Sequence, residues 1–593
     1  MTLSVVTEER AYPTLVGEFA YEVAWRPERQ YIAGTQVELC GEDNMAHRWT
    51  YVRAAVDIGD VTFRWTAGES SPERVIVRAT LPYGVRRGQH VLFSLVVRPP
   101  MWPCDGLPLS IRIVPPPSPW NPDEPPPEAE REEGSCCVLL TTEGPVHRVS
   151  AYARPAPDVR GKIRLSIVPE DRYGNPSPFR ESIPVRIEWQ GETRTHPVQG
   201  TTHVLLDAGQ EVSRVRACIP MEALSLDENV ENGAREDGDL VVTGNPVSPA
   251  EGSELRPAFG AIHWHTTITD GWHSLGRAFA NARDHLNLDF AVPGDHAPRE
   301  ERWQQTVDGV DAFYEPGSFV TLYGGEAGSD RGHTGVYSAQ PDWPSRSADR
   351  FWLRDPAEVA EGLSADEGTV VIANHPAVNG VPYWDSYAWG APAGALRLVE
   401  VLAWGNQERS VYPDAWRGWF QRSGASVQDA LAMGHRVGFV GSSDNHPGWP
   451  GRLFHEQSKG LHPPKSVILT GAWVAALDRQ SLYDALWARR TWAVWDTRAV
   501  VWFTLNGVPM GDVLRVARGE ALEAEICLWA EDALQAVELV SDGRAVWRAS
   551  SAHPDVAVDV PLGEAARSTH FYLRALQRNG GIVYASPVFV DVE

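Results

Sequence analysis

The stretch Ala261-Ile262-His263-Trp264-His265-Thr266-Thr267-Ile268-Thr269-Asp270-Gly271 places two histidines at the end of an apolar run that starts at Ala258. If this run is a β-strand, residues two positions apart point to the same face, so His263 and His265 would lie side by side. Neutral imidazole is a good ligand for divalent metals, and Asp270 in the following turn can add an oxygen ligand. A His-x-His sequence also occurs without a metal. The downstream sequence favours the metal interpretation, because similar signals recur there.

Side chains with metal-binding chemistry follow several other predicted strands between residues 255 and 500. The strand-like segments are 288–292, 319–323, 370–373 and 437–440. The residues that follow them are Asp295 and His296, Glu326 and His333, His375, and Asp444 and His446. Helix-like segments alternate with these strands, which predicts a parallel sheet, closed or open. In a parallel α/β barrel the carboxyl ends of the strands open on one face, so these side chains would converge there on a polynuclear metal site.

The rest of the chain reads as β-rich modules. Residues 1–114 predict a β-sandwich-like domain, because short strands alternate with Gly and Pro. A linker rich in Pro and acidic residues follows at 115–134. Residues 135–250 resemble an immunoglobulin-like module with an Asp-x-x-Gly-Asn-Pro turn, and 499–593 predict a C-terminal β-sandwich domain. The barrel-like region is then 255–498.

Composition excludes several classes of function. The chain has 593 residues and a net charge of -25, from 53 basic and 78 acidic side chains. Such a surface repels phosphate backbones, so we expect no nucleic-acid binding. No apolar stretch approaches the ~20 residues of a membrane helix, and the first residues lack the pattern of a signal peptide. We therefore expect a cytoplasmic protein without membrane association, with its scattered cysteines reduced.

The order of the candidate ligands resembles the PHP (polymerase and histidinol phosphatase) superfamily, over roughly residues 255–500. Further likeness to a large, poorly characterised bacterial branch lies in Gly332-His333-Thr334-Gly335-Val336-Tyr337, Leu469-Thr470-Gly471-Ala472-Trp473 and Ala485-Leu486-Trp487-Ala488-Arg489-Arg490-Thr491. The resemblance implies a metal-dependent phosphoesterase. The expected fold class is α/β, with a (β/α)7-type barrel catalytic domain flanked by all-β sandwich domains.

Trinuclear members of the superfamily imply an assignment of the ligands. One metal would be held by His263, His265, Glu326 and Asp444; Glu326 would bridge to a second held by His333 and His375; Asp270, His296 and His446 would hold a third. Two or three divalent ions are therefore expected, and zinc, manganese or iron suit these nitrogen and oxygen donors. The family usually has Asp-Leu before the first histidine, where this chain has Ala261-Ile262. That difference removes a carboxylate that could orient the histidine ligand.

The expected reaction is hydrolysis of a small-molecule phosphoester by a metal-activated water. Asp270 and Glu326 are candidate catalytic residues beside the metals. Arg331 and Arg452 lie close in sequence to the metal motifs and are candidates to clamp the phosphate, although an ordinary surface role is the alternative for each. A homo-oligomer is also possible.

Two other functions remain open from the sequence. Metal-dependent barrels also hydrolyse amides, lactones or sulfate esters. Amidohydrolase-type barrels usually carry a metal-bridging lysine, however, and no lysine lies between residues 263 and 446. The other alternative is a binding or scaffold protein with a relic barrel. The complete set of candidate ligands argues against it. The β-modules could cover the active-site face or build an oligomer interface.

Overall fold

A computed structural model of the chain describes most residues from 144 to 593 and shorter segments before them. Within 144–593 the ranges outside the description are 172–173, 225–229, 231, 249–253, 272, 297–299, 330–331, 342–357, 360–362, 364–367, 378–383, 385–395, 404–424 and 453–466. Before residue 144 the described residues are mainly those of the strands. In the described part of the chain, none of the helices combines the length and apolar character needed to span a membrane.

The chain divides into two compact units, Met1–Gly144 and Pro145–Glu593. The strands of the first unit form a four-stranded sheet in the order β1-β3-β8-β5, a five-stranded sheet in the order β10-β9-β4-β7-β6, and the parallel pair β11-β2. Their bounds are β1 Thr2–Val5, β2 Ala11–Pro13, β3 Phe19–Arg26, β4 Gln36–Glu42, β5 Thr50–Val56, β6 Asp60–Thr62, β7 Glu73–Thr80, β8 Val91–Arg98, β9 Leu109–Val114, β10 Glu130–Glu132 and β11 Leu140–Thr142.

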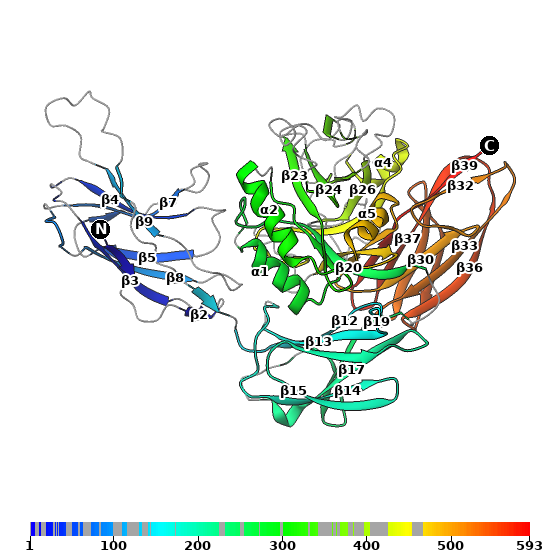
Figure 1. Ribbon diagram of the computed structural model, residues 1–593, viewed down its shortest axis with the longest axis horizontal. Coiled ribbons are helices and arrows are strands. Elements are labelled where there is room, and N and C mark those ends of the chain that lie inside the picture. Colours follow the sequence, from blue (N-terminus) through cyan, green and yellow to red (C-terminus); the bar gives the residue numbers. More distant parts are fainter. Residues whose placement is uncertain are drawn as a thin grey trace. The chain divides into compact units, whose positions relative to one another are not determined.

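The second unit begins with a β-module that packs two antiparallel sheets face to face (Figure 1). Its strands are β12 Arg148–Ala153, β13 Lys162–Glu170, β14 Ile183–Trp189, β15 Glu192–Val198, β16 Thr202–Asp207, β17 Ser213–Pro220, β18 Ala234–Glu236 and β19 Asp239–Val247, with a 3-10 turn η1 at Met221–Ala223. Strand β14 shows the cause of the packing, since Ile183, Val185 and Ile187 are buried while the residues between them face outward. The inward side chains of both sheets form one apolar core.

The module is followed by a 16-stranded sheet, part of which is parallel (Figure 1). The pairs β22-β21, β21-β20, β20-β27, β27-β26 and β26-β25 all run parallel. These strands are β20 Arg256–Trp264, β21 Phe290–Val292, β22 Val320–Thr321, β25 Thr369–Ala373, β26 Leu396–Leu402 and β27 Gly438–Asn445. Their carboxyl ends therefore lie at one edge, which positions the site described below.

The expected (β/α)7-type barrel is wrong, because the strand content and the pairing differ from it. Strands β23 (Tyr323–Ser329) and β24 (Gly332–Ser338) form an antiparallel hairpin, and β24 also pairs antiparallel with β25. Strand β28 (Ile468–Val474) pairs antiparallel with β20 and leads to β29 (Thr491–Trp495). Few helices accompany the strands among the described residues: α1 Leu275–Ala280 with the π-turn η2 Asn281–His285, α2 Glu300–Phe313, α4 Val427–Ala432 and α5 Arg479–Trp487. The described fold is mostly β.

The same sheet continues into the C-terminal strands. Strand β29 pairs with β38, which pairs with β37, and β37 pairs with β34. The remaining strands are β30 Val500–Leu505, β31 Val508–Pro509, β32 Val513–Val516, β33 Ala521–Trp529, β34 Leu534–Ser541, β35 Arg544–Ser551, β36 Asp555–Glu564, β37 Thr569–Gln577, β38 Ile582–Ala585 and β39 Val588–Val592. One apolar cluster joins Phe259 and Trp264 of β20 to Trp492 and Leu573, so the two regions share a core. The boundaries expected near 250 and 498 stay predictions.

Candidate metal centre

The side chains expected as metal ligands meet at the carboxyl ends of the parallel strands. Their donor atoms form four groups, each within 4.8 Å: His265, Asp270, His296 and His446; His263, His375 and Asp444; His263, His265 and Glu326; and His296, Glu326 and His333. Most of the nine are buried, and His296 and His333 keep about a third of their side-chain surface exposed. Groups of this composition and spacing can hold metal ions.

Glu326 lies at the centre of the cluster. Its Oε1 is 3.1 Å from Nε2 of His263 and 3.1 Å from Nδ1 of His333, and its Oε2 is 2.9 Å from Nδ1 of His296. Nε2 of His375 is 3.3 Å from the same Oε1. Glu326 thus contacts four imidazoles of the cluster.

The grouping differs in detail from the implied assignment. His333 groups with His296 and Glu326, whereas His375 groups with His263 and Asp444. Asp270, His296 and His446 do lie together, and His265 joins them. The ring of His265 stacks on that of His446 with centroids 4.2 Å apart. Because His265 also groups with His263 and Glu326, it links these two parts of the cluster.

Glu400 is a buried carboxylate of the site that the sequence reasoning missed. Its Oε1 lies 2.7 Å from Nδ1 of His263, and its Oε2 accepts a hydrogen bond of 2.7 Å from the backbone N–H of His375. Fixing Nδ1 of His263 leaves Nε2 facing the cluster, which is how a carboxylate orients a metal-ligating histidine. The only signal in the sequence is a glutamate inside the apolar strand Leu396–Leu402.

Asp295 holds the loop that carries Asp270. It accepts hydrogen bonds from the backbone N–H of Thr266 at 2.8 Å and from the hydroxyls of Thr266 and Thr269 at 2.8 and 2.7 Å. The amide of Asn374 similarly donates to Oε1 of Glu326 at 2.9 Å. These contacts reduce the freedom of the ligands before any cation binds.

Three of the clustered residues have a left-handed backbone. The φ angles are 56° at His263, 24° at His375 and 43° at Asp444. For a residue with a Cβ such a conformation costs about 1–3 kcal/mol, and it persists where the surroundings enforce it. At His263 it coincides with a register shift between β20 and β27. The pair His263 and His265 therefore does not reach the cluster by the regular alternation of a strand.

Charges within the cluster shift the pKa values of its members. Although burial lowers the pKa of His296, Glu326 and Asp270 raise it to about 11. Burial lowers the pKa of His265 to about 3, and the rings of His446 and His296 act in the same direction. Burial would raise the pKa of Glu326, but His333 and His263 hold it well below its usual value. The metal-free cluster thus keeps ionised carboxylates beside protonated imidazoles, and cations could replace those protons.

Unsatisfied buried atoms indicate that the donor set suits a metal. Nε2 of His263, Nδ1 of His265, Nε2 of His446 and Oε2 of Glu326 are buried, and their close contacts to charged groups of the cluster lack hydrogen-bond geometry. Buried polar atoms are rarely left in this state, because each costs about 1–3 kcal/mol. All four point to the cluster, where coordination to a divalent ion would satisfy them.

The two arginines expected to clamp a phosphate are not part of the described cluster. Arg331 lies outside the described residues. Arg452 is buried and forms an ion pair with Glu170, a buried residue of β13 in the β-module. Its charge is therefore matched by Glu170, and the expected clamp is replaced by a contact that joins the module to the sheet.

Comparisons with known proteins give no established function. No protein-family model matches the chain. An uncharacterized protein of Chlamydia pneumoniae is 22% identical over 379 residues, which cover 58% of this chain and 59% of the relative; the match therefore spans less than two thirds of that protein. An uncharacterized protein of Chlamydia muridarum is 23% identical over 221 residues, covering 33% of this chain and 34% of the relative.

Two solved structures illustrate the likeness found among known folds. A two-domain protein from Bacteroides vulgatus, described as containing a predicted PHP-like metal-dependent phosphoesterase, is 12% identical and covers 57% of this chain and 95% of its own, with a TM-score of 0.30. A β-glucuronidase of Bacteroides uniformis is 9% identical and covers 97% of this chain and 74% of its own, with a TM-score of 0.21. At these TM-scores no conclusion about this chain follows from either likeness.

Proposed function

We propose that the protein is a metal-dependent hydrolase of small-molecule phosphoesters, acting at the cluster around Glu326. The observation that carries the proposal is the convergence of His263, His265, Asp270, His296, Glu326, His333, His375, Asp444 and His446 into overlapping groups with the spacing of metal ligands. Overlapping groups that share Glu326, His263, His265 and His296 favour two or three ions over one. Zinc, manganese and iron are the candidates.

The residues of the cluster have distinct parts in this proposal. When bound, divalent ions would polarise the phosphoryl oxygens and lower the pKa of a water molecule to near neutral. Glu326 would bridge two ions, and Asp444 and Asp270 would each supply carboxylate oxygens to one end of the cluster. Glu400 would keep the ring of His263 in place, and Asp295 would hold the loop of Asp270. His296 and His333, which remain partly exposed, lie where a substrate would enter.

The test combines metal content with turnover. Purified protein loaded with manganese, zinc or iron is expected to retain at least two ions per chain and to hydrolyse p-nitrophenyl phosphate or its diester analogue. Glu326→Gln should lower the metal content of the protein, because it removes the central charge. It should also lower the rate of hydrolysis by at least about a hundredfold. Glu523→Gln, at an exposed position of β33, is the matched control.

Two results would overturn the proposal. Less than one ion per chain would favour a scaffold protein. Metal-loaded protein that hydrolyses neither phosphate probe would instead indicate another bond, such as an amide or a lactone.

A further inference from the structure

A cavity of about 320 Å³ lies at the opposite end of the parallel strands from the metal cluster. It is lined by the turn between β12 and β13, by β16, by Arg256 at the start of β20, and by residues 315–318 before β22. Strand β20 carries Arg256 at its first residue and His263 near its last. At ~3.3 Å per residue the two sites are roughly 23 Å apart. The volume is within the range of small-molecule pockets, which begins at about 300 Å³.

The lining is basic in a chain that is strongly acidic. Five cationic side chains face the cavity: Arg154, Arg160, Lys162, Arg164 and Arg256. The carboxylates in the lining are Asp158 and Glu315. An excess of positive charge in a hollow attracts anions, because the low-dielectric walls focus the field.

Most of these cations already have a partner beside the cavity. Arg160 pairs with Asp158, Lys162 with Asp207 and Arg164 with Asp284. All three pairs are partly exposed, and such pairs contribute little to stability. These three pairs hold the cations beside the cavity. Arg154, by contrast, pairs with Asp289 at 3.7 Å, and its guanidinium donates to the side chain of Asn287 and to the backbone carbonyls of Ser318 and Leu288.

Arg256 differs from the other four. Its Nη2 donates to the backbone carbonyl of Ala156 at 3.2 Å, and its Nε is buried without a hydrogen-bond partner. Among the described residues no carboxylate lies within ion-pair distance of Arg256. Burial lowers the pKa of Arg256 and of Arg154, and the charge of Asp289 opposes this effect in both. An anion in the cavity beside Arg256 would satisfy this donor.

The rim of the cavity is apolar. Val159 is 94% exposed and Leu205 is 53% exposed, and both line the cavity. They are two of the few large apolar side chains that are exposed among the described residues. Exposed aliphatic side chains at the edge of a charged pocket suit a ligand with a short apolar group.

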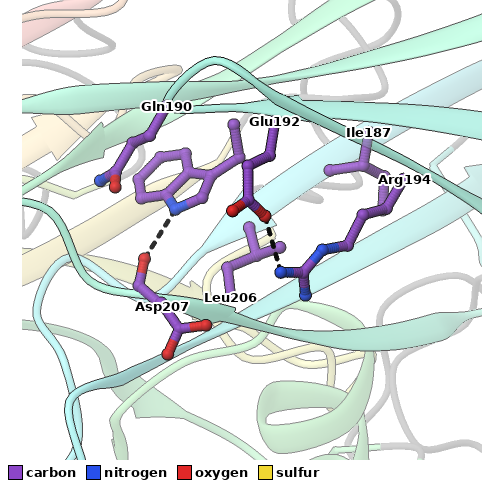
Figure 2. A pocket seen from close by; sticks show the side chains of 7 residues that line it. Ile187, Gln190, Glu192, Arg194, Leu206 and Asp207 are labelled. Atoms are coloured by element: carbon purple, nitrogen blue, oxygen red, sulfur yellow. Dashed lines mark hydrogen bonds and ion pairs between the residues drawn. The ribbon is translucent and has the colours of Figure 1, made fainter.

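A smaller cavity of about 90 Å³ on the same module lacks these properties (Figure 2). Its charged pair, Glu192 and Arg194, is matched internally at 2.7 Å. The indole N–H of Trp189 donates to the backbone carbonyl of Asp207 at 2.7 Å. Figure 2 shows the contact between Glu192 and Arg194 at this pocket.

We propose that the cavity at Arg256 binds a small organic oxyanion, a phosphate or a carboxylate, that carries a short apolar group. The guanidinium groups of Arg256 and Arg160 would hold the oxyanion, and Val159 and Leu205 would contact the apolar part. This site is separate from the proposed hydrolytic centre, so it does not depend on the proposed function.

Calorimetric titration of the full chain with n-butylphosphonate tests the proposal, because this probe has no ester bond to hydrolyse. Saturable binding is expected. Arg256→Gln should reduce the affinity about tenfold, and Arg160→Gln should reduce it about threefold. Because the side chain of Arg160 is exposed, its replacement should not affect folding. Arg544→Gln, at an exposed position on β35, should bind like the wild type. Val159→Ser should weaken butylphosphonate while leaving methylphosphonate unchanged.

Asp444→Asn distinguishes the two sites, since it should leave this binding unchanged although it alters the metal cluster. Butyrate in place of butylphosphonate tells a carboxylate ligand from a phosphate. Absence of saturable binding of both probes at millimolar concentration would overturn the proposal, as would unchanged binding in both arginine variants or loss of binding in Asp444→Asn.

Discussion

Oε1 of Glu400 lies 2.7 Å from Nδ1 of His263, although 137 residues separate them in the chain. The same carboxylate accepts the backbone N–H of His375 through its other oxygen. One buried side chain on β26 therefore positions two residues of the metal cluster, which come from β20 and from the end of β25. This carboxylate could take the place of the one missing from Ala261-Ile262.

Replacing this carboxylate should weaken metal binding. Glu400→Gln keeps the size of the side chain but removes its charge, and loss of such a partner typically lowers metal affinity by about 10- to 100-fold. Competition with a chromogenic chelator measures the affinity. Exposed Glu523→Gln should leave it unchanged. If Glu400→Gln binds metal as tightly as the wild type, the contact between Glu400 and His263 does not contribute to metal affinity.

A single methyl group beside His263 should disturb the cluster. A Cβ at Gly294 would lie 2.5 Å from Cδ2 and 2.9 Å from Cα of His263, closer than real contacts allow. Gly294→Ala is therefore expected to lose at least one metal ion per chain, measured by elemental analysis. Gly276→Ala in α1 is the control, since its Cβ would meet Phe313 at an ordinary 3.5 Å. If Gly294→Ala keeps its full metal content, the packing around His263 is not essential.

Metal binding should release protons. The pKa of His296 in the metal-free cluster is about 11, since Glu326 and Asp270 outweigh the effect of burial, so this ring is protonated at pH 8. A metal can bind a ring nitrogen only after that nitrogen loses its proton, and the apparent affinity should rise as the pH increases from 6 to 8. Zinc titrations in buffers of different ionisation enthalpy count the protons. Heats that do not depend on the buffer would contradict this expectation.

The ion pair between Glu170 and Arg452 should stabilise the second unit in a pH-dependent way. Removing one partner of a buried pair costs about 3–5 kcal/mol, which is the loss expected for Glu170→Gln at pH 7. Burial would raise the pKa of Glu170, but Arg452 and Arg148 hold it below the usual value of a glutamate. The contribution is therefore fully present above about pH 4.5 and is lost as the pH falls through the lower, folded-state pKa.

Denaturant unfolding of the wild type and of Glu170→Gln at pH 7 and pH 3 measures this difference, which should shrink in acid. Exposed Glu211→Gln should unfold like the wild type at both pH values. A difference that stays constant between the two pH values would exclude the ion pair as its source.

The candidate ligands stand out in the sequence because they lie within or shortly after apolar, strand-like segments. Residues such as Glu326, His375 and Asp444 interrupt apolar segments with side chains that are costly to bury alone. Glu400 could not be recognised in the same way, since its contact with His263 is set by the pairing of distant strands. The backbone conformation at His263 was likewise not visible, because residue type does not specify a left-handed angle outside glycine.

The fold was harder to predict than the site. Fully buried strands read as apolar runs whether their neighbours are parallel or antiparallel, so β28 gave no sign of its direction. The hairpin β23-β24 was not predicted, because its residues were expected only to follow the strand-like segment 319–323. Arg452 was assigned to the substrate because it is close in sequence to Asp444, whereas its partner Glu170 lies 282 residues away in another module.

The continuity of the large sheet has a consequence for how the protein is made. Strand β20 carries His263 and has β28 as a neighbour; β28 pairs with β29, and β29 pairs with β38 at Ile582–Ala585. On the ribosome, the hydrogen bonds along this path can be completed only after residues beyond 580 have left the exit tunnel. Until then β29 has an open edge, and a chain stalled during translation would expose it to other nascent chains.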